Sequence, residues 1–409
     1  MKKELLREFA LLAVTNGANV QKGQPLVINA PAEAYELVRE CVKAAYEVGA
    51  SSVIVNFDDD KVTRMHMEYA ETEVLKEVPQ WSLDRYQWYI DKGVCFLHII
   101  SGDPDLLNGI DPNKLREVQM ERMKATHKFQ YYTMNNIGQW SIIAVPNTAW
   151  AKKVFPDKSD EEAYQALEDA ILYTSRVEEG KTLDNWDKHN AEIQDHAKIM
   201  NDLAFKELRF RNNSGTDITV GLIKDHVWHG GCDETPKGVI FNPNIPTEEV
   251  FTMPDRRRID GTVHASKPLS YGGKLINDFT LTFKDGVVVD YDAKENKETL
   301  KNLLEMDEGS KSLGEVALIS YDSPISKSGI LFYNTLFDEN ASCHLALGAS
   351  YPYTVKGGTE MSTEELYELG GNDSMNHVDF MFGTEDMEVI GVKWDGEEVK
   401  VSENGNFVI

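Results

Sequence analysis

The stretch GGNDSMNHVDFMFG, residues 370–383, holds the strongest local signal for chemistry in this sequence. His377 and Asp379 stand two residues apart, between a Gly-Gly-Asn turn and an apolar run. On an extended backbone, residues i and i+2 project from the same face, so the imidazole and the carboxylate point at one spot. A strand can present two metal ligands in this way. The alternative is a buried histidine that the protein itself satisfies, next to a surface aspartate.

Acidic residues and histidines also gather in three other stretches whose surroundings are apolar or turn-like. These stretches are NPNIPTEEVFT (242–252), LGEVALI (313–319) and FDENASCH (337–344). Glu315 stands near the start of LGEVALI, and the rest of that run is typical of a buried strand. Burying a lone carboxylate costs several kcal/mol unless the group is paired, protonated or bound to a cation. A salt bridge would satisfy Glu315 as well as a metal would.

The other two stretches also have simple structural interpretations. Glu248 and Glu249 follow Pro-Thr, an order that is typical of a capping box opening a short helix or turn. Glu339 and His344 are five residues apart, so they do not share one helical face, although a turn between them would bring both to one point. As an isolated pair they are typical of a helix cap and a core histidine. Each stretch is therefore ambiguous by itself.

Together, the four stretches supply four carboxylates and two imidazoles, with one further glutamate to spare. Carboxylates with one or two histidines form a donor set that Zn, Co, Mn or Mg ions occupy. One catalytic ion keeps roughly three or four protein ligands, so six donors fit two ions that share a bridging carboxylate. Paired ions roughly 3.5–4 Å apart polarise a carbonyl and lower the pKa of a water between them, which is what amide hydrolysis requires. The sequence therefore predicts a site for two divalent ions.

These residues need a scaffold, and the first part of the chain has the pattern of an α/β layer. Apolar runs rich in Val and Ile predict buried strands at residues 24–30, 51–57, 94–101 and 141–147. Residues 32–50 have apolar side chains at helical spacing. Strand, helix and strand at this spacing predict parallel pairing with helices on both faces of the sheet. No G-x-G-x-x-G or G-x-x-x-x-G-K-[ST] motif follows these strands, which argues against a nucleotide site.

The second part of the chain alternates apolar and polar residues from about residue 207. Hairpin turns are predicted at Asp285-Gly286, Asp395-Gly396 and Asn404-Gly405. One helix is predicted at 294–307. The expected fold class is therefore an α/β N-terminal domain with a mostly parallel sheet and flanking helices, followed by an α+β, largely antiparallel C-terminal domain.

Length and pattern together give the domain organisation. At 409 residues the chain exceeds one ordinary core, which favours two domains. A long polar helical run at 160–208 connects the two patterns. We predict an α/β N-terminal domain at 1–185 and a metal-binding catalytic domain at 186–409, with the boundary within about 180–208.

Composition excludes several classes of partner. Asp and Glu total 68 against 42 Lys and Arg, and a formal charge of −26 repels phosphate backbones and anionic lipid. We therefore expect no nucleic acid partner. No apolar run approaches the roughly 20 residues of a membrane span, and the N-terminus is typical of an amphipathic helix, not of a signal peptide. The four cysteines form no CxxC pair, which favours reduced thiols and a cytoplasmic location.

The four acidic stretches, together with TDITVGL (216–222), resemble the metalloaminopeptidase family typified by aminopeptidase T and aminopeptidase S, also called the thermophilic aminopeptidases. The resemblance covers the chain from end to end. It implies a two-domain cytoplasmic enzyme, usually a homodimer, whose C-terminal domain holds two divalent cations. It also implies an enzyme that removes N-terminal amino acids from short peptides with a free N-terminus.

The resemblance also assigns roles to single residues. Carried over position by position, the family's metal ligands fall on Glu249, Glu315, Glu339, His344, His377 and Asp379. A motif tyrosine near the metals falls on Tyr351 in GASYPYT, where its phenol could donate to a developing oxyanion. Glu248 is adjacent to a ligand but is not one in this assignment, so it is the candidate general base.

Two other functions remain compatible with the residues. One is a different dimetal hydrolase such as a phosphoesterase, which needs cationic groups for phosphate, and the run Arg256, Arg257 and Arg258 could supply them. The other is a non-catalytic binding protein in which the same acids and histidines form only salt bridges. Such a protein would bind no metal and would be insensitive to chelators.

Overall fold

The computed structural model describes residues 1–272 and 274–409. Contacts divide the described residues into two units, the first comprising Met1–Lys188 with Cys232–Pro246 and the second comprising His189–Gly231 with Thr247–Ile409. The division predicted at 185/186 lies next to the first of these boundaries. The return of the chain to the first unit at residue 232 has no counterpart in that prediction, because the segment is short and carries no distinctive composition.

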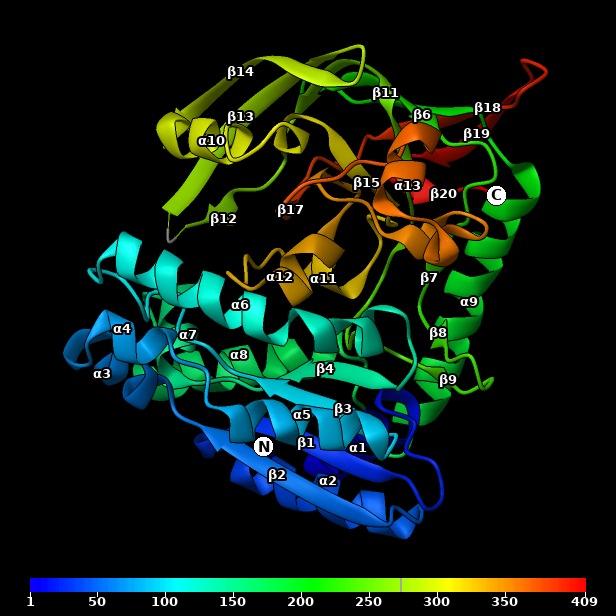
Figure 1. Ribbon diagram of the computed structural model, residues 1–409. Coiled ribbons are helices and arrows are strands. Elements are labelled where there is room, and N and C mark those ends of the chain that lie inside the picture. Colours follow the sequence, from blue (N-terminus) through cyan, green and yellow to red (C-terminus); the bar gives the residue numbers. More distant parts are fainter. Residues whose placement is uncertain (273) are drawn as a thin grey trace. The chain divides into compact units, whose positions relative to one another are not determined.

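A parallel sheet organises the first unit, as predicted (Figure 1). Its order is β2-β1-β3-β4, with bounds Ser52–Asp58, Pro25–Pro31, Cys95–Ile100 and Trp140–Ala144. All neighbouring pairs in it are parallel. Val27 and Phe96 pack against Tyr89 of α5 (Gln80–Asp91) and Tyr132 of α6 (Pro112–Met134), while the alternate residue Leu26 is also fully buried. Both faces of the sheet are therefore covered.

Helices supply that cover and connect the strands. They are α1 (Lys3–Leu12), α2 (Tyr35–Glu47), α3 (Asp60–Tyr69), α4 (Thr72–Lys76), α5 (Gln80–Asp91), α6 (Pro112–Met134), α7 (Thr148–Val154) and α8 (Asp160–Thr174). The helix α9 (Thr182–Leu203) leads into the second unit. Ser159 and Glu162 form a capping box that starts α8, which explains where that helix begins. Every helix of the described residues is too short or too polar to span a lipid bilayer.

The segment 232–246 completes the first unit at the edge of its sheet. It forms the strands β8 (Asp233–Glu234) and β9 (Ile240–Phe241) and then runs beside β4, the last strand in the sheet order. The Ile142 amide donates to the Pro243 carbonyl over 2.8 Å, and the Ile245 amide donates to the Ile142 carbonyl over 3.0 Å. The outer edge of β4 is therefore paired by residues about 100 positions further along the chain.

Antiparallel strands dominate the second unit, which confirms the predicted fold class. The larger sheet has the order β12-β13-β11-β6-β5-β18-β19-β20, and β14 pairs with β13. The bounds are β5 (Glu207–Arg211), β6 (Asp217–Leu222), β11 (Pro254–His264), β12 (Leu269–Tyr271), β13 (Lys274–Lys284), β14 (Val287–Glu295), β18 (Glu388–Val392), β19 (Glu398–Glu403) and β20 (Asn406–Phe407). Asp285 and Gly286 have φ of 50° and 84°, the left-handed pair that the predicted hairpin turn requires.

A smaller antiparallel sheet lies in the same unit, with the order β17-β16-β15-β10-β7. Its strands are β7 (His229–Gly230), β10 (Val250–Thr252), β15 (Leu313–Leu318), β16 (His344–Gly348) and β17 (His377–Met381). The helices of the unit are α10 (Lys297–Leu304), α11 (Pro324–Ser328), α12 (Thr335–Asp338) and α13 (Thr363–Leu369). Val316, Leu345 and Phe380 of the smaller sheet share one core with Leu208 and Val220 of the larger sheet. One face of the smaller sheet thus packs into the hydrophobic core of the second unit.

Candidate metal centre

The other face of the smaller sheet collects the residues that the sequence singles out as ligands. Glu315 of β15 pairs with Ala346 of β16, and Ala346 pairs with Asp379 of β17. Directly paired residues lie on one face of a sheet, as do residues two apart on one strand. His344, two residues before Ala346, and His377, two residues before Asp379, therefore lie on the face that carries Glu315.

Glu249 joins this face from the position immediately before β10. Phe251 pairs with Ala317, which is two residues after Glu315, and Glu249 is two residues before Phe251. The sheet thus aligns donors from β15, β16 and β17 with the residue that precedes β10. Ala317 and Ala346 occupy positions between the donors on the same face, and their small side chains leave space there.

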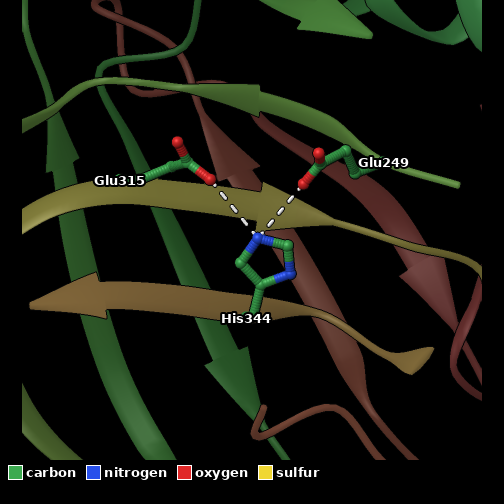
Figure 2. A group of neighbouring side chains, drawn as sticks. All are labelled: Glu249, Glu315 and His344. Carbon is green, nitrogen blue, oxygen red and sulfur yellow. Dashed lines mark hydrogen bonds and ion pairs between the residues drawn. The ribbon is translucent and has the colours of Figure 1, made fainter. Parts of the chain in front are cut away.

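His344 is the centre of a first group of donors. Its Nε2 atom lies 3.1 Å from Glu249 Oε2 and 3.3 Å from Glu315 Oε1. Figure 2 shows the two carboxylates converging on this nitrogen from different segments of the chain. Two atoms bound to one tetrahedral ion at about 2.0–2.1 Å are about 3.3 Å apart, so these separations suit a common ion. All three side chains are buried, His344 with 1% of its surface exposed.

His377 is the centre of a second group. Its Nε2 atom lies 3.4 Å from Asp379 Oδ1 and 3.9 Å from Glu315 Oε2. Within each group, among the described residues, the donor atoms lie within 4.8 Å of one another. Glu315 belongs to both groups, because its two oxygens face different imidazoles. This is the arrangement expected of a carboxylate shared by two cation sites.

Hydrogen bonding prepares one imidazole for a ligand. The Nδ1 atom of His377 lies 2.7 Å from the Ala349 carbonyl and donates to it, so Nε2 is the ring nitrogen directed at the carboxylates and the one that could bind an ion. Asp379 Oδ1 is buried and accepts no hydrogen bond from any described residue. A buried carboxylate oxygen in that state is costly unless a cation is nearby. The donor set of carboxylate oxygens and imidazole nitrogens therefore fits a hard or borderline divalent cation.

The electrostatics of the group lead to the same conclusion. Burial raises the pKa of Glu339 well above its usual value, and the charges of Asp379 and Glu249 raise it further. Burial lowers the pKa of His377, but the charge of Asp379 outweighs burial and raises this pKa to about 10. The negative charges of the cluster thus raise the pKa of the neighbouring groups. Divalent cations would supply positive charge and allow the carboxylates to stay ionised.

Two of the predicted acidic site residues, Glu339 and Glu248, lie outside both groups. Glu339 belongs to the short 3-10 helix η4 (Glu339–Ala341) and is half-buried, with a weak hydrogen bond of 3.5 Å from Asn340 Nδ2. Glu248 has its carboxylate 3.9 Å from His189 Nε2, and its amide donates to Asn340 Oδ1 over 2.8 Å. The loop that carries the two adjacent glutamates is thereby fixed to η4.

Tyr351 lies beside the second group. Its ring centroid is 4.7 Å from that of His377, and the side chain is half-buried. Sequence reasoning did not find the aromatic residues around it, Phe251 and Tyr353, whose ring centroids lie 6.5 Å and 5.6 Å from that of Tyr351. The spacing of Phe251, two residues after Glu249, was the available signal, since an extended backbone puts both on one face.

The arginine run does not behave as a phosphate site. Arg257 Nε lies 2.8 Å and Arg258 Nε 3.0 Å from the two carboxylate oxygens of Asp255, which is 5% exposed. Arg256 stacks on Tyr367 with its guanidinium carbon 3.5 Å from the ring centroid. All three guanidinium groups therefore contact protein groups and stabilise β11.

The Asp255→Asn variant should lose about 1–3 kcal/mol of unfolding free energy at neutral pH, because two guanidinium groups lose a charged acceptor. Burial raises the pKa of Asp255, but hydrogen bonds from Arg257 and Arg258 outweigh it and lower this pKa. The stabilisation is therefore complete above the ordinary aspartate pKa and is lost as the pH falls through the lower folded value. Urea denaturation at pH 7 and in steps down to pH 3 measures the difference.

The matched control is Asp260→Asn, which removes an exposed aspartate that pairs with Lys284. This control should cost less than about 0.5 kcal/mol. Equal costs for the two variants at pH 7 would contradict a structural role for Asp255.

A sheet face that gathers carboxylates and imidazoles around Glu315 defines a candidate metal-binding protein. The sequence profile described as "Thermophilic metalloprotease (M29)" matches residues 2–407. The chain belongs to this family, and the resemblance inferred from its motifs is confirmed.

Individual relatives are similar to this chain over nearly their whole length. The chain is 44% identical over 402 residues to "Aminopeptidase AmpS" of Bacillus subtilis (strain 168), covering 98% of each chain. It is 38% identical over 406 residues to "Aminopeptidase T" of Thermus aquaticus, covering 99% of each. The solved structure "Wild-type AmpT from Thermus thermophilus" superposes with a TM-score of 0.93 at 36% identity and covers 100% of both chains. The fold predicted from the sequence is therefore that of a known member of the family.

Proposed function

We propose that this chain, a metal-dependent aminopeptidase, removes N-terminal amino acids from short peptides with the help of two divalent ions. The metal ligands in this proposal are Glu249, Glu315, Glu339, His344, His377 and Asp379. When bound, such a pair of ions polarises the scissile carbonyl and activates a water for attack. The remaining roles belong to side chains of the protein.

The position of Glu315 is the main observation that supports two ions. Its Oε1 atom lies 3.3 Å from His344 Nε2 and its Oε2 atom 3.9 Å from His377 Nε2. One carboxylate that faces two imidazoles supports two neighbouring cation positions better than one. Glu339 enters the ligand set through the family resemblance, supported by its electrostatic coupling to Asp379 and Glu249.

Tyr351 and Glu248 have the catalytic roles in this proposal. The phenol of Tyr351 donates a hydrogen bond to the oxyanion that develops on the scissile carbonyl. Glu248 accepts a proton as general base, and its place directly before Glu249 supports this role. The free α-amine that every substrate of this class carries would be held by one of the ions or by a neighbouring carboxylate.

Removal and return of metal is the decisive experiment. The protein is stripped with a chelator, and hydrolysis of aminoacyl amides is followed after zinc, cobalt, manganese or magnesium is added back separately. We expect activity to vanish on stripping and to return with at least one of these ions, two bound per chain. N-acetylated amides, which lack the free amine, should resist cleavage. Full activity of the stripped chain, or release of phosphate from esters instead of amines from amides, would reject the proposal.

The Glu248→Gln variant tests the general base. We expect kcat to fall by about 100- to 10,000-fold, because glutamine cannot accept the proton, with bound metal unchanged. Elemental analysis and initial rates on the same preparation measure both quantities. Loss of metal would instead make Glu248 a ligand, and unchanged kcat would exclude it from proton transfer.

Three broader features accompany the proposal. The chain is expected to act as a homodimer in the cytoplasm, as the resemblance implies. The physiological ion is one of Zn, Co, Mn or Mg. The phosphoesterase alternative loses support because the guanidinium groups of Arg256, Arg257 and Arg258 contact protein groups.

A further inference from the structure

The side chain of Asn372 joins three stretches of backbone beside the candidate metal centre. Its Nδ2 atom lies 2.8 Å from the Gly309 carbonyl oxygen, 2.7 Å from that of Gly348 and 3.2 Å from that of Ser312. The side chain is buried. An asparagine amide has two N–H donors and no charge, so it can serve these carbonyls without burying an ion. Asn372 therefore ties the end of β16 to the segment that leads into β15.

The main chain of Asn372 adds two hydrogen bonds to the residue before Tyr351. The Ser350 amide donates to the Asn372 carbonyl over 2.9 Å, and the Asn372 amide donates to Ser350 Oγ over 3.0 Å. On the other side, the Tyr351 carbonyl accepts from the Thr354 hydroxyl over 2.7 Å and from the Thr354 amide over 3.1 Å. The backbone of Tyr351 is thus held from both directions, and Asn372 provides the support on one of them.

Ala349, which lies between the two residues that Asn372 binds, pairs with the end of the same loop. The Ala349 amide donates to the Asn376 carbonyl over 2.7 Å, and the Ala349 carbonyl lies 2.7 Å from His377 Nδ1. A Cβ atom on Gly348 would lie 2.2 Å from the Asn376 carbonyl oxygen, so only glycine allows the two segments to approach this closely. The segment 348–350 therefore has little freedom to move while Asn372 is in place.

We propose that Asn372 is a positioning residue that places the phenol of Tyr351 for its hydrogen bond to the developing oxyanion. This assignment rests on the proposed function, in which Tyr351 is that donor. Among the described residues, the hydrogen bonds of Asn372 go to backbone groups and to Ser350 Oγ, so Asn372 acts through the backbone that carries Tyr351. A misplacement of about 1 Å in a catalytic group can cost about 100-fold in rate.

The Asn372→Ala variant should lower kcat for leucine amide about 10- to 100-fold, with KM and metal content within about 2-fold of the wild type. In the Tyr351→Phe background the same substitution should change kcat less than about 3-fold, because the donor that Asn372 places is already absent. A substitution that merely loosened the protein would lower kcat by the same factor in both backgrounds. Steady-state kinetics on the wild type, the two single variants and the double variant measure this coupling, together with metal content and melting temperature.

Two further variants separate hydrogen bonding from packing and from stability. Asn372→Asp keeps the shape of the side chain but replaces its donors with an oxygen that faces carbonyl oxygens, so kcat should fall at least as far as in Asn372→Ala. The matched control is Asn212→Ala, which removes a side chain that accepts from the Ser214 and Thr216 amides between β5 and β6. This control should lower the melting temperature and leave kcat within about 2-fold.

The outcomes distinguish this inference from the proposed function. A wild type that cleaves no aminoacyl amide would reject the proposed function itself. If the wild type cleaves amides, an equal loss of kcat in both backgrounds, wild-type kcat in Asn372→Asp, or loss of metal in Asn372→Ala would overturn only the role of Asn372. If Asn372→Ala does not fold, Ser350→Ala removes the single bond from the Asn372 amide and decides by the same comparison. Its kcat should fall at least about 3-fold, and no further loss should follow in the Tyr351→Phe background.

Discussion

The Glu315→Gln variant should lose both bound ions and at least about 1,000-fold of kcat. Glutamine keeps the size of the side chain but removes its charge and one acceptor oxygen, at the residue whose oxygens face both His344 and His377. Loss of a residue that merely orients a ligand already weakens metal binding about 10- to 100-fold, so loss of a shared ligand should exceed that range. Elemental analysis after gel filtration gives the metal content, and circular dichroism verifies the fold.

Variants that remove a donor from only one of the two groups test whether Glu315 is shared between them. Glu249→Ala removes a donor from the His344 group only, and His377→Ala removes the centre of the other group only. Each should lower the metal content, and each should retain more than Glu315→Gln does. The same metal content in all three variants would rule out Glu315 as a shared ligand. Undiminished content in either alanine variant would refute the assignment of that residue as a ligand.

The Tyr351→Phe variant should lower kcat about 100- to 1,000-fold while KM and metal content stay within about 2-fold of the wild type. This is the usual loss when one hydrogen-bond donor to an oxyanion is removed. Burial raises the pKa of Tyr351, and the nearby charge of Glu315 raises it further, so the phenol keeps the proton that it must donate. Phenylalanine preserves the ring that packs against His377.

The neighbouring Tyr353 supplies the control for that variant. Its ring centroid lies 5.6 Å from that of Tyr351, and Tyr353→Phe should change kcat less than about 3-fold. Steady-state kinetics on leucine amide, with metal content measured in parallel, distinguish the two variants. If Tyr351→Phe lowered metal content along with kcat, the phenol would be supporting the site and not the oxyanion.

Much of the architecture follows from the amino-acid sequence. The predicted strands at 24–30, 51–57, 94–101 and 141–147 correspond to β1, β2, β3 and β4, because each combines β-branched residues with turn formers at its end. The stretch LGEVALI forms β15, and the His-Val-Asp stretch begins β17 as an extended segment. Strong local patterns of this kind survive in the folded chain.

The sheet that carries the candidate site could be predicted only in part. The strand β10 has only three residues, and its preceding glutamates resemble a capping box, so no periodicity identifies it. All residues of β16 are buried, which removes the alternation that identifies a half-exposed strand. In β15, Glu315 and Ala317 lie on the face of the candidate site, whereas Val316 and Leu318 lie on the face of the core. A count of apolar residues along the strand does not distinguish these two faces. The ligand set therefore required the family resemblance, and its roles stay predictions.

The pairing of β4 with the segment around Asn244 has a consequence for any attempt to isolate the first unit. A fragment that stops at residue 185 would lack this late segment and would present the outer backbone groups of β4 to solvent. Unpaired strands of that kind recruit copies of themselves, so the truncated piece should self-associate. The outer edge of the parallel sheet in the first unit is therefore paired only after the first part of the second unit has been synthesised.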